Sequence, residues 1–461
     1  MTGSMNWPTN SNNRKIQALL ISPHERGNTV SNDAVFPFPS LTLPLLAGFF
    51  PENYRVRIKD EKVSRVSGKE KADIVFITTL TSTAHRAYTL ADLFRTRGIP
   101  VVIGGVHATM LPQEAQEHAT SVVIGEAEDM VSRLLSDFEK SRLAPVYRSP
   151  GLTDLATILN PSLHLLNWRH RFFLSPLQTS RGCPNMCDFC AVPRISGRKL
   201  RTKSLTEVEK ELVFLSRFRS RKLFVVDDNF TLKRDRSLQL MELFRKFGFR
   251  WMAFSNLSVS EDDEYMKALA DSGCISLFIG FESLHIQDHL SKNRSYGTPG
   301  AMAHAVDRIH KHGIGIQGSF IFGFDSDTPE VFRETVSFIQ DTKIELPHLC
   351  ILTPFPGTPL FDELESKGRI IHKDWSCYDM NHVVFRPENM SQEELQQGYA
   401  WSLKYLSSPT SILARIKKRS AARFYFLTAN FALHRSQTRL ARSLWNTRIQ
   451  TLMQEKGLSL C

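Results

Sequence analysis

The segment Arg181-Gly-Cys-Pro-Asn-Met-Cys-Asp-Phe-Cys190 places three cysteines within eight positions. Spacings of four and three residues let one short loop wrap three thiolates around a single small object. Thiolate is the soft ligand that iron–sulfur clusters prefer. A [4Fe–4S] cube has four irons, so three cysteines leave one iron open to a substrate or cofactor. The motif therefore predicts a [4Fe–4S] cluster on Cys183, Cys187 and Cys190.

A structural zinc site is the main alternative for these thiols. Such a site is closed and needs a fourth ligand nearby. His170 precedes the first strand expected in this region, and the next Cys or His after Cys190 is Cys274. Neither is well placed, so the sequence favours the cluster.

The region around the motif alternates strands with helices. Strands are expected at 174–179, 222–227, 250–256, 276–282, 315–324 and 348–354. The helices between them are expected to begin at Ser204, Arg234, Ser260, Thr298 and Thr328, where Ser204 and Thr328 suit N-cap chemistry. Six such units predict a partial (β/α)6 TIM-type barrel, open on one side, with its chemistry at the carboxyl ends of the strands.

The first 150 residues show a second alternation, typical of an α/β fold. Strands are expected at 15–21, 54–58, 72–78, 100–104 and 121–125, and helices at 41–50, 85–97 and 127–140. This order predicts a Rossmann-like, doubly wound parallel sheet. The expected organisation is a domain at 1–150, a linker at 151–170, the barrel at 171–365 and a helical C-terminal extension at 366–461.

The cysteine motif resembles the signature of the radical S-adenosylmethionine (SAM) superfamily, Cys-x3-Cys-x2-Cys with an aromatic residue before the last cysteine. Phe189 holds that position. The resemblance covers about residues 170–365. It implies that the open iron binds the amino and carboxylate groups of SAM. One electron from the cluster then gives a 5′-deoxyadenosyl radical, which abstracts hydrogen from an unactivated carbon.

The same resemblance suggests which residues hold SAM. Asp228 is expected to take the ammonium group, and Glu282 and Ser283 to bond the ribose hydroxyls or the methionine end. Backbone at three glycines is expected to contact adenine: Gly315, Gly318 and Gly323. The alternative is that the acids cap helices and the glycines ease packing.

The stretches 102–112 and 123–128 resemble the cobalamin-binding domain that precedes many radical SAM barrels. The corrinoid is then expected against the strand ends, between the two domains. The residues expected to line it are Thr79, Thr81, Ser82, Gly104, Gly105, His107 and Gly125. His24 lies in a His-x-x-Gly turn, but Ser22 replaces the Asp that would orient a cobalt-ligating imidazole, which favours a surface histidine.

Two chemistries follow from this resemblance. With methylcobalamin, the substrate radical would take the cobalt-bound methyl group, and a second SAM would remethylate cobalt. Without methyl transfer, the radical would drive cyclisation, oxidation or carbon–carbon coupling. A non-enzymatic iron–sulfur sensor or scaffold is a remote alternative, because a sensor more often closes its cluster with a fourth ligand.

The segments 352–360 and 374–387 resemble the C-terminal extension of hopanoid methylases and related cobalamin-dependent radical methyltransferases. That branch implies a hydrophobic, lipid-like or natural-product-like substrate. Tyr378 and His382 are candidates to handle a proton or radical. A packed, hydrogen-bonded pair is the alternative for these two residues.

Charge is concentrated at the end of the chain. Residues 408–461 carry ten Lys or Arg and one acid, or +9 of the total net charge of +11. Leu413, Ile416, Phe424, Leu427 and Phe431 fall near helical spacing among these basic residues. A basic amphipathic helix suits an anionic membrane surface, while a helix packed on the barrel with a solvated face is the alternative.

Partners and location follow from these features. Nucleic acid is disfavoured, because tRNA-modifying methylthiotransferases carry three further N-terminal cysteines and none precedes Cys183. A small flavodoxin or ferredoxin is the electron donor that the superfamily implies. No apolar run reaches the ~20 residues that cross a bilayer, and the first 13 residues lack the apolar core of a signal peptide. The expected location is cytoplasmic, with peripheral contact to the inner face of the membrane through the basic tail.

Overall fold

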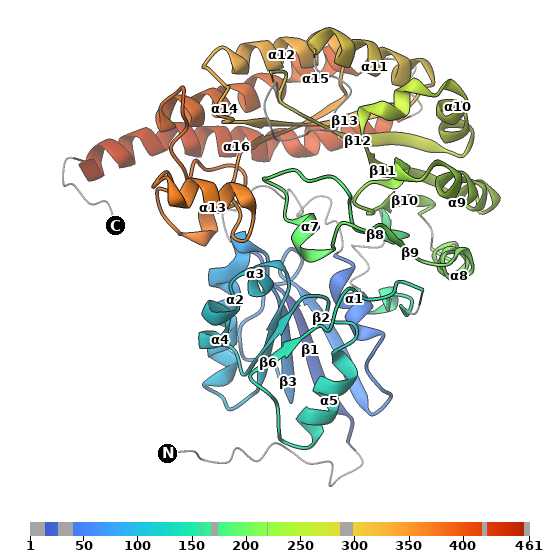
Figure 1. Ribbon diagram of the computed structural model, residues 1–461, viewed down its shortest axis with the longest axis vertical. Helices are drawn as coiled ribbons and strands as arrows, with labels where there is room; N and C mark the ends of the chain where they lie inside the picture. The colour runs from blue at the N-terminus through green and yellow to red at the C-terminus, as the bar shows by residue number, and fades with distance from the viewer. Residues whose placement is uncertain are drawn as a thin grey trace.

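The computed structural model describes residues 14–25, 40–156, 158–166, 174–218, 220–285, 298–416 and 422–455, with side chains as far as 444 in the last range. Two parallel six-stranded sheets lie one above the other (Figure 1). The N-terminal sheet forms the lower unit in this view, and the second sheet curves through the upper unit. Helix α13 (Pro359–Ser366) lies where the two units meet.

The N-terminal sheet has the strand order β2-β1-β3-β4-β5-β6. Its strands are β1 (Ile16–Ser22), β2 (Tyr54–Asp60), β3 (Ile74–Thr78), β4 (Val101–Gly104), β5 (Ser121–Ile124) and β6 (Val146–Arg148). Its helical segments are α1 (Thr42–Ala47), η1 (Thr81–Thr83), α2 (Ala84–Arg95), α3 (Val106–Met110), α4 (Pro112–His118) and α5 (Val131–Glu139). All five predicted strands and three predicted helices are present. The short elements α3, α4 and β6 were not predicted.

Alternate residues of each inner strand serve two different cores. Leu19 and Ile21 of β1 pack with α2 on one face of the sheet, whereas Leu20 packs with α1 and α5 on the other. A parallel sheet covered by helices on both faces needs apolar residues on both sides of its strands. This is why β1 and β3 read as continuous apolar runs, and the doubly wound fold is confirmed.

The second sheet has the strand order β14-β13-β12-β11-β10-β7, all parallel. Its strands are β7 (Ser175–Leu177), β10 (Lys222–Val225), β11 (Arg250–Ser255), β12 (Cys274–Glu282), β13 (Gly315–Phe322) and β14 (Leu346–Ile351). Its helical segments are η2 (Leu163–Leu165), α8 (Leu205–Leu215), η3 (Phe230–Leu232), α9 (Arg234–Lys246), η4 (Leu257–Glu261), α10 (Asp263–Asp271), α11 (Pro299–Lys311) and α12 (Val331–Thr342). Strands β7 and β14 are the two edges, so the predicted partial barrel is confirmed.

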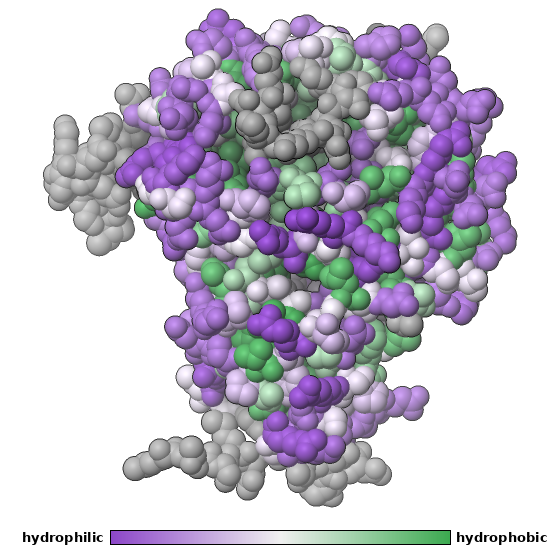
Figure 2. Space-filling model, viewed as in Figure 1, coloured by the Kyte–Doolittle hydropathy of each residue, from purple (hydrophilic) through white to green (hydrophobic). Residues whose placement is uncertain are grey.

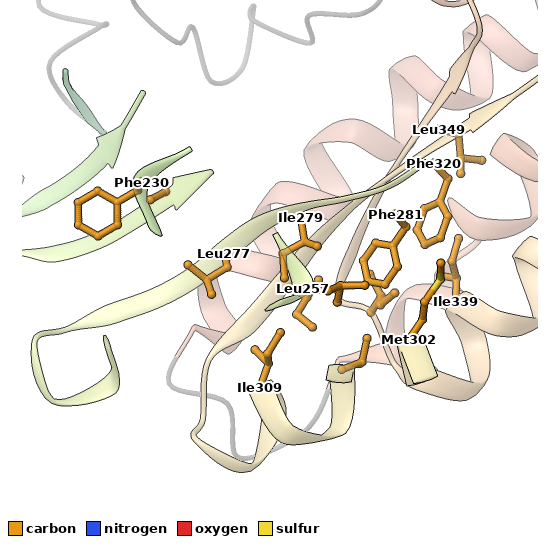
Figure 3. Close-up of a cluster of buried hydrophobic side chains, with 14 of the residues drawn as sticks. Phe230, Leu257, Leu277, Ile279, Phe281, Met302, Ile309, Phe320, Ile339 and Leu349 are labelled. Atoms are coloured by element: carbon orange, nitrogen blue, oxygen red, sulfur yellow. The ribbon is translucent and has the colours of Figure 1, made fainter. Parts of the chain in front are cut away.

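The central strand β12 anchors the barrel core. Leu277, Ile279 and Phe281 alternate along it and point to the same side, toward Met302 and Ile309 of α11 (Figure 3). The Phe281 ring stacks on Phe320 of β13 with 4.9 Å between centroids. Fully burying one such side chain stabilises the fold by about 1.5–3 kcal/mol.

Helix starts agree with the cap chemistry at Ser204 but not at two other positions. The Ser204 hydroxyl accepts the Glu207 N–H at 3.2 Å. Helix α10 begins after Asp262 instead of Ser260, because residues 257–261 form a 3₁₀ turn and the Asp262 carboxylate accepts the Tyr265 N–H at 2.9 Å. Helix α12 begins at Val331, since the Thr328 hydroxyl instead donates to the side chain of Glu330.

The remaining elements frame the cysteine motif and make up the C-terminal extension. The two-stranded ribbon β8 (Ser180–Arg181) and β9 (Arg201–Thr202) and helix α7 (Val192–Ile195) surround the motif. The extension contributes η5 (Trp375–Cys377), α14 (Gln392–Leu406), α15 (Pro409–Arg415) and α16 (Arg423–Glu455).

The surface of the described residues is mixed. On the face seen in Figure 2, hydrophilic residues dominate, and hydrophobic residues occur in small groups. Among the described residues, no helix is long and apolar enough to span a membrane.

Candidate active site

The three motif cysteines line one cavity of about 320 Å³ at the carboxyl ends of the barrel strands. The loop turns tightly, with the Cys190 N–H donating to the Cys187 carbonyl at 3.0 Å and the Cys183 N–H to the Gly197 carbonyl at 3.3 Å. Gly182 has φ +97°, and a β-carbon there would collide with the Lys199 carbonyl. The glycine before the first cysteine is therefore a steric requirement of the loop.

The two aspartates after β10 have different roles. Asp227 is buried and accepts the Thr179 N–H at 2.6 Å and the Ser180 hydroxyl at 2.7 Å. Asp228 accepts the Gly182 N–H at 2.7 Å and also lines the cavity. Burial raises the pKa of both carboxyls. Of the pair, only Asp228 reaches the space beside the thiols, where a cofactor ammonium group would be received.

The thiols suit a cluster better than a single ion. Burial raises the pKa of Cys190 to about 11 and that of Cys183 above its ordinary value. Metal must therefore displace protons to bind. Among the described residues, no three His, Cys, Asp or Glu side chains are placed to hold one metal ion. Three thiols line one cavity of about 320 Å³. This arrangement fits a [4Fe–4S] cube that is bound through three of its four irons.

Glu282 ends β12 and lines the same cavity. Its φ is +63°, and the sheet register shifts between Gly280 and Glu282. The carboxylate lies back over Gly280, where a β-carbon would overlap it. A strained backbone at a cavity is typical of functional sites. Ser283 lies elsewhere, since its hydroxyl is 3.4 Å from Asp327 and it is not among the cavity-lining residues.

The three candidate glycines on β13 and after it do not line the cavity. A β-carbon at Gly315 would overlap the ring of Phe426 in α16, and one at Gly318 would lie 3.0 Å from Phe320. Gly323 has φ +104° and donates its N–H to Asp327 at 2.9 Å. All three glycines therefore lie where a β-carbon would crowd a neighbouring side chain.

Another part of the cavity lining was not identified from the sequence. It combines polar residues after β11 with aromatic and aliphatic residues. These residues are Phe254, Ser255, Asn256, Leu257, Ser258, Phe278, Phe281, Met302 and Ser319. The only sequence signal was the run 255–258 following a strand end. The three thiols thus share the cavity with polar groups such as Asn256 and with apolar side chains such as Phe254 and Phe278.

A second cavity of about 60 Å³ lies between the N-terminal sheet and helices α1 and α5, and Gly104 and Gly105 line it. Gly105 has φ +101°, and a β-carbon there would lie 2.7 Å from the Thr79 nitrogen. Thr79 is buried and supports this turn by donating its hydroxyl to the Gly104 carbonyl at 2.9 Å. A cavity of this size admits only a small part of a corrinoid, so of the cobalamin candidates the structure places Gly104 and Gly105 beside a cavity at the strand ends.

The other cobalamin candidates line neither cavity. Thr81 is buried and Ser82 is half-buried in η1. Gly125 donates its N–H to the Thr109 hydroxyl at 3.1 Å. His24 donates its backbone N–H to Glu61 at 3.1 Å.

His107, also a cobalamin candidate, is fully buried. Its Nε2 atom lies 3.2 Å from Glu114 and its ring packs 5.4 Å from Trp375 of η5. His107 therefore joins the N-terminal sheet to the C-terminal extension.

Tyr378 and His382 also lie outside the lining of the cysteine cavity. The buried Tyr378 hydroxyl donates to the His372 carbonyl at 2.8 Å. His382 Nδ1 is 2.9 Å from Asp379. Burial lowers the pKa of His382, but the hydrogen bond and charge of Asp379 outweigh it and raise that pKa overall. Both contacts are those of packed, hydrogen-bonded residues.

Comparison with known proteins agrees with this geometry. The family model described as the radical SAM superfamily matches residues 177–339, and that of the B12 binding domain matches residues 29–135. Bacteriochlorophyllide d C-12(1)-methyltransferase of Chlorobaculum tepidum is 31% identical over 93% of this chain and 94% of its own length. This chain belongs to the radical SAM superfamily, in its cobalamin-binding branch.

Two further likenesses agree with this assignment, one in sequence and one in fold. Hopanoid C-2 methylase of Rhodopseudomonas palustris is 24% identical over 74% of this chain and 67% of its own length. The fold matches radical SAM methyltransferase TsrM of Kitasatospora setae, solved with cobalamin and a [4Fe–4S] cluster, with a TM-score of 0.65 and 16% identity over 94% of this chain and 100% of that one. The expectations of a cobalamin-dependent radical SAM methyltransferase and of its three cofactors are confirmed.

Proposed function

We propose that this enzyme methylates an unactivated carbon of a hydrophobic polycyclic substrate, with a bacteriochlorophyllide-type tetrapyrrole as the favoured class. The observation that carries the proposal is the single cavity shared by three thiols and an aromatic wall. The relatives named for bacteriochlorophyllide and hopanoid methylation support a flat, largely apolar substrate.

The chain's own residues divide the work of this cavity. When bound, the cluster supplies the electron that cleaves SAM to the radical, and cobalamin supplies the methyl group that replaces the hydrogen atom the radical removes. Asp228 offers a carboxylate beside the thiols for the cofactor ammonium, and Glu282 offers a second carboxylate in the same cavity. Phe254 and Phe278, which are half-buried and line the cavity, exclude water and present flat apolar surfaces to a ring system.

Enzyme reconstituted with iron, sulfide and cobalamin tests the proposal. The reduced enzyme is given SAM labelled with deuterium in its methyl group, together with bacteriochlorophyllide d and, separately, a hopanoid. The proposal predicts labelled methyl on the tetrapyrrole carbon skeleton. Loss of two hydrogens or a new ring, without label, would instead identify a radical oxidase or cyclase. Labelled hopanoid with unlabelled tetrapyrrole would reassign the substrate class.

Two electrons are required for each methyl group transferred. One would go to the cluster for SAM cleavage, and the other to the cobalamin, which would supply the methyl group. We propose a small flavodoxin or ferredoxin as the source, on the basis of superfamily membership. Replacing the chemical reductant with purified flavodoxin and its reductase, or with reduced ferredoxin, should sustain turnover. Absence of turnover with each of these two protein donors would contradict this assignment.

We also propose that α16 contacts an anionic membrane surface. Phe424 and Phe431 are 77% and 43% exposed, and Arg435 and Arg442 share their face of the helix at 3.6 residues per turn. The sequence has no Asp or Glu between Glu394 and Glu455. Exposed aromatic residues beside cations suit the boundary between lipid headgroups and acyl chains, which would give access to a lipid-soluble substrate.

Sedimentation with vesicles tests this contact. We expect the enzyme to bind vesicles containing phosphatidylglycerol, to bind phosphatidylcholine vesicles less, and to lose binding in the double variant Phe424→Ser, Phe431→Ser. Val213→Ser is the matched control, because Val213 is also exposed but lies on α8. Equal binding by the double variant would overturn the proposal.

A further inference from the structure

Four charged side chains meet where the N-terminal sheet faces the cluster loop. Glu126 and Glu128 follow Gly125 at the carboxyl end of β5, and Arg181 lies two residues before Cys183. Arg201 is the partner of Arg181 in the ribbon of β8 and β9, which Figure 1 shows between the lower sheet and the upper barrel. Their side chains are only 5–12% exposed.

The contacts join the two units directly. Arg201 holds Glu126 with both guanidinium nitrogens, at 2.7 and 2.8 Å. Arg181 lies 3.1 Å from the same carboxylate and donates to Glu128 at 2.8 Å. Glu126 also accepts the Thr153 N–H at 2.7 Å. Burial alone would raise the pKa of Glu126, but Arg201 and its other partners lower it, so the carboxylate is charged.

Such a network specifies geometry more than it adds stability. Buried ion pairs contribute little net stability because their desolvation offsets their attraction. Forked Arg–carboxylate pairs, however, fix both distance and angle. Here the fixed elements are the carboxyl end of β5, within the region that matches the B12 binding domain, and the entry to the cysteine loop.

We infer that Glu126 is a positioning residue that sets the cobalamin-holding sheet relative to the cluster loop through Arg181 and Arg201. The inference rests on the proposed methyl transfer, in which the radical formed beside the cluster must be generated within reach of the methyl donor. A displacement of about 1 Å in such a reaction can lower its rate about 100-fold. We expect radical formation to depend on the barrel and therefore to continue when the sheet is displaced.

If Glu126 has this role, changing it should uncouple radical formation from methyl transfer. Glu126→Asp keeps the charge but shortens the side chain by one methylene, so it cannot span both guanidinium groups. We expect the ratio of 5′-deoxyadenosine to methylated product to rise about tenfold or more, with iron and cobalamin contents unchanged. Amide hydrogen exchange at 125–128 and 180–183 is expected to speed up, a change that needs no turnover.

Two further variants complete the experiment. Glu363→Asp is the matched control, because Glu363 forms an exposed ion pair with Lys367 of its own helix, α13. Arg201→Lys keeps the charge but loses the fork, and it replaces Glu126→Asp if that variant does not fold. A wild-type ratio and wild-type exchange in the folded variants would overturn the inference. If the wild type itself forms no methylated product, the proposed methyl transfer is wrong. The hydrogen-exchange data alone then test whether Glu126 holds the sheet to the cluster loop.

Discussion

The Asp228 carboxylate accepts the backbone N–H of Gly182 at 2.7 Å, so the residue that faces the cavity also fixes the peptide before the first cluster cysteine. Its neighbour Asp227 points to Thr179 and Ser180 instead. One aspartate therefore serves the cavity and the other secures the strand end behind it.

This division predicts different defects for the two aspartates. Asp228→Asn should fold, keep much of its iron and raise the apparent KM for SAM at least about tenfold, because a charge-assisted hydrogen bond contributes about 1.5–3 kcal/mol. Asp227→Asn should mainly lower the midpoint of thermal unfolding, because Asp227 is buried and bonds only the chain itself. The measurement is SAM-dependent deoxyadenosine formation beside thermal unfolding. Identical profiles for the two variants would contradict the division.

Cys187→Ala should lose the cluster and with it deoxyadenosine formation. Cys274→Ala is the control, because Cys274 is buried in the barrel core and lies outside the cavity. Iron content and absorbance after anaerobic reconstitution distinguish the two. Unchanged deoxyadenosine formation by Cys187→Ala would favour a scaffold over an enzyme.

Gly105→Val should abolish cobalamin retention while the cluster still assembles. A β-carbon at Gly105 would meet the Thr79 nitrogen at 2.7 Å, and valine adds branching at a positive φ. Gly98→Val is the control, because Gly98 also has a positive φ but a β-carbon there meets nothing within 4 Å. The measurement is corrin absorbance after desalting, and full corrin retention by Gly105→Val would remove the cavity from the cobalamin site.

Glu114 links the N-terminal sheet to the extension and should make that link acid-sensitive. Burial opposes its charge, but hydrogen bonds from His107, Trp375 and Tyr88 lower its pKa to about 2. A lowered folded-state pKa gives stability that is present above the ordinary value near 4.5 and is lost as pH falls toward 2. Unfolding measured from pH 6 to 3 should show a smaller decline for Glu114→Gln than for wild type. Parallel curves would contradict this role.

Tyr378→Phe should keep methyl transfer and lose about 1 kcal/mol of stability, because its hydroxyl donates to the His372 carbonyl outside the cavity. Product formation and chemical denaturation are the two measurements. A loss of activity without a loss of stability would restore Tyr378 as a candidate for radical or proton chemistry.

Much of the fold was predictable because its signals are local. Apolar runs such as 74–78 indicate burial on both faces of the sheet. Three cysteines at fixed spacing indicate a metal-binding loop. Short elements such as β6 carry too few residues for a periodic pattern.

The site was harder to predict, because which strand-end residues face the cavity depends on register and turn geometry. Asp228 and Glu282 line the cavity, whereas Ser283 does not. The glycines 315, 318 and 323 gave no sign of whether they approach a ligand or a neighbouring side chain. The Glu126–Arg201 pair joins residues 75 positions apart, and no local pattern reports such a contact.

Transfer of labelled methyl from SAM to the enzyme's own cobalamin tests the central claim most directly, because it needs no knowledge of the substrate. The enzyme is reconstituted with iron, sulfide and hydroxocobalamin, desalted, reduced anaerobically and given SAM with a deuterated methyl group. We predict corrin that stays with the protein, carries the labelled methyl and appears with S-adenosylhomocysteine. Retained corrin without label, accompanied by deoxyadenosine alone, would contradict methyl transfer and indicate a radical cyclase or oxidase.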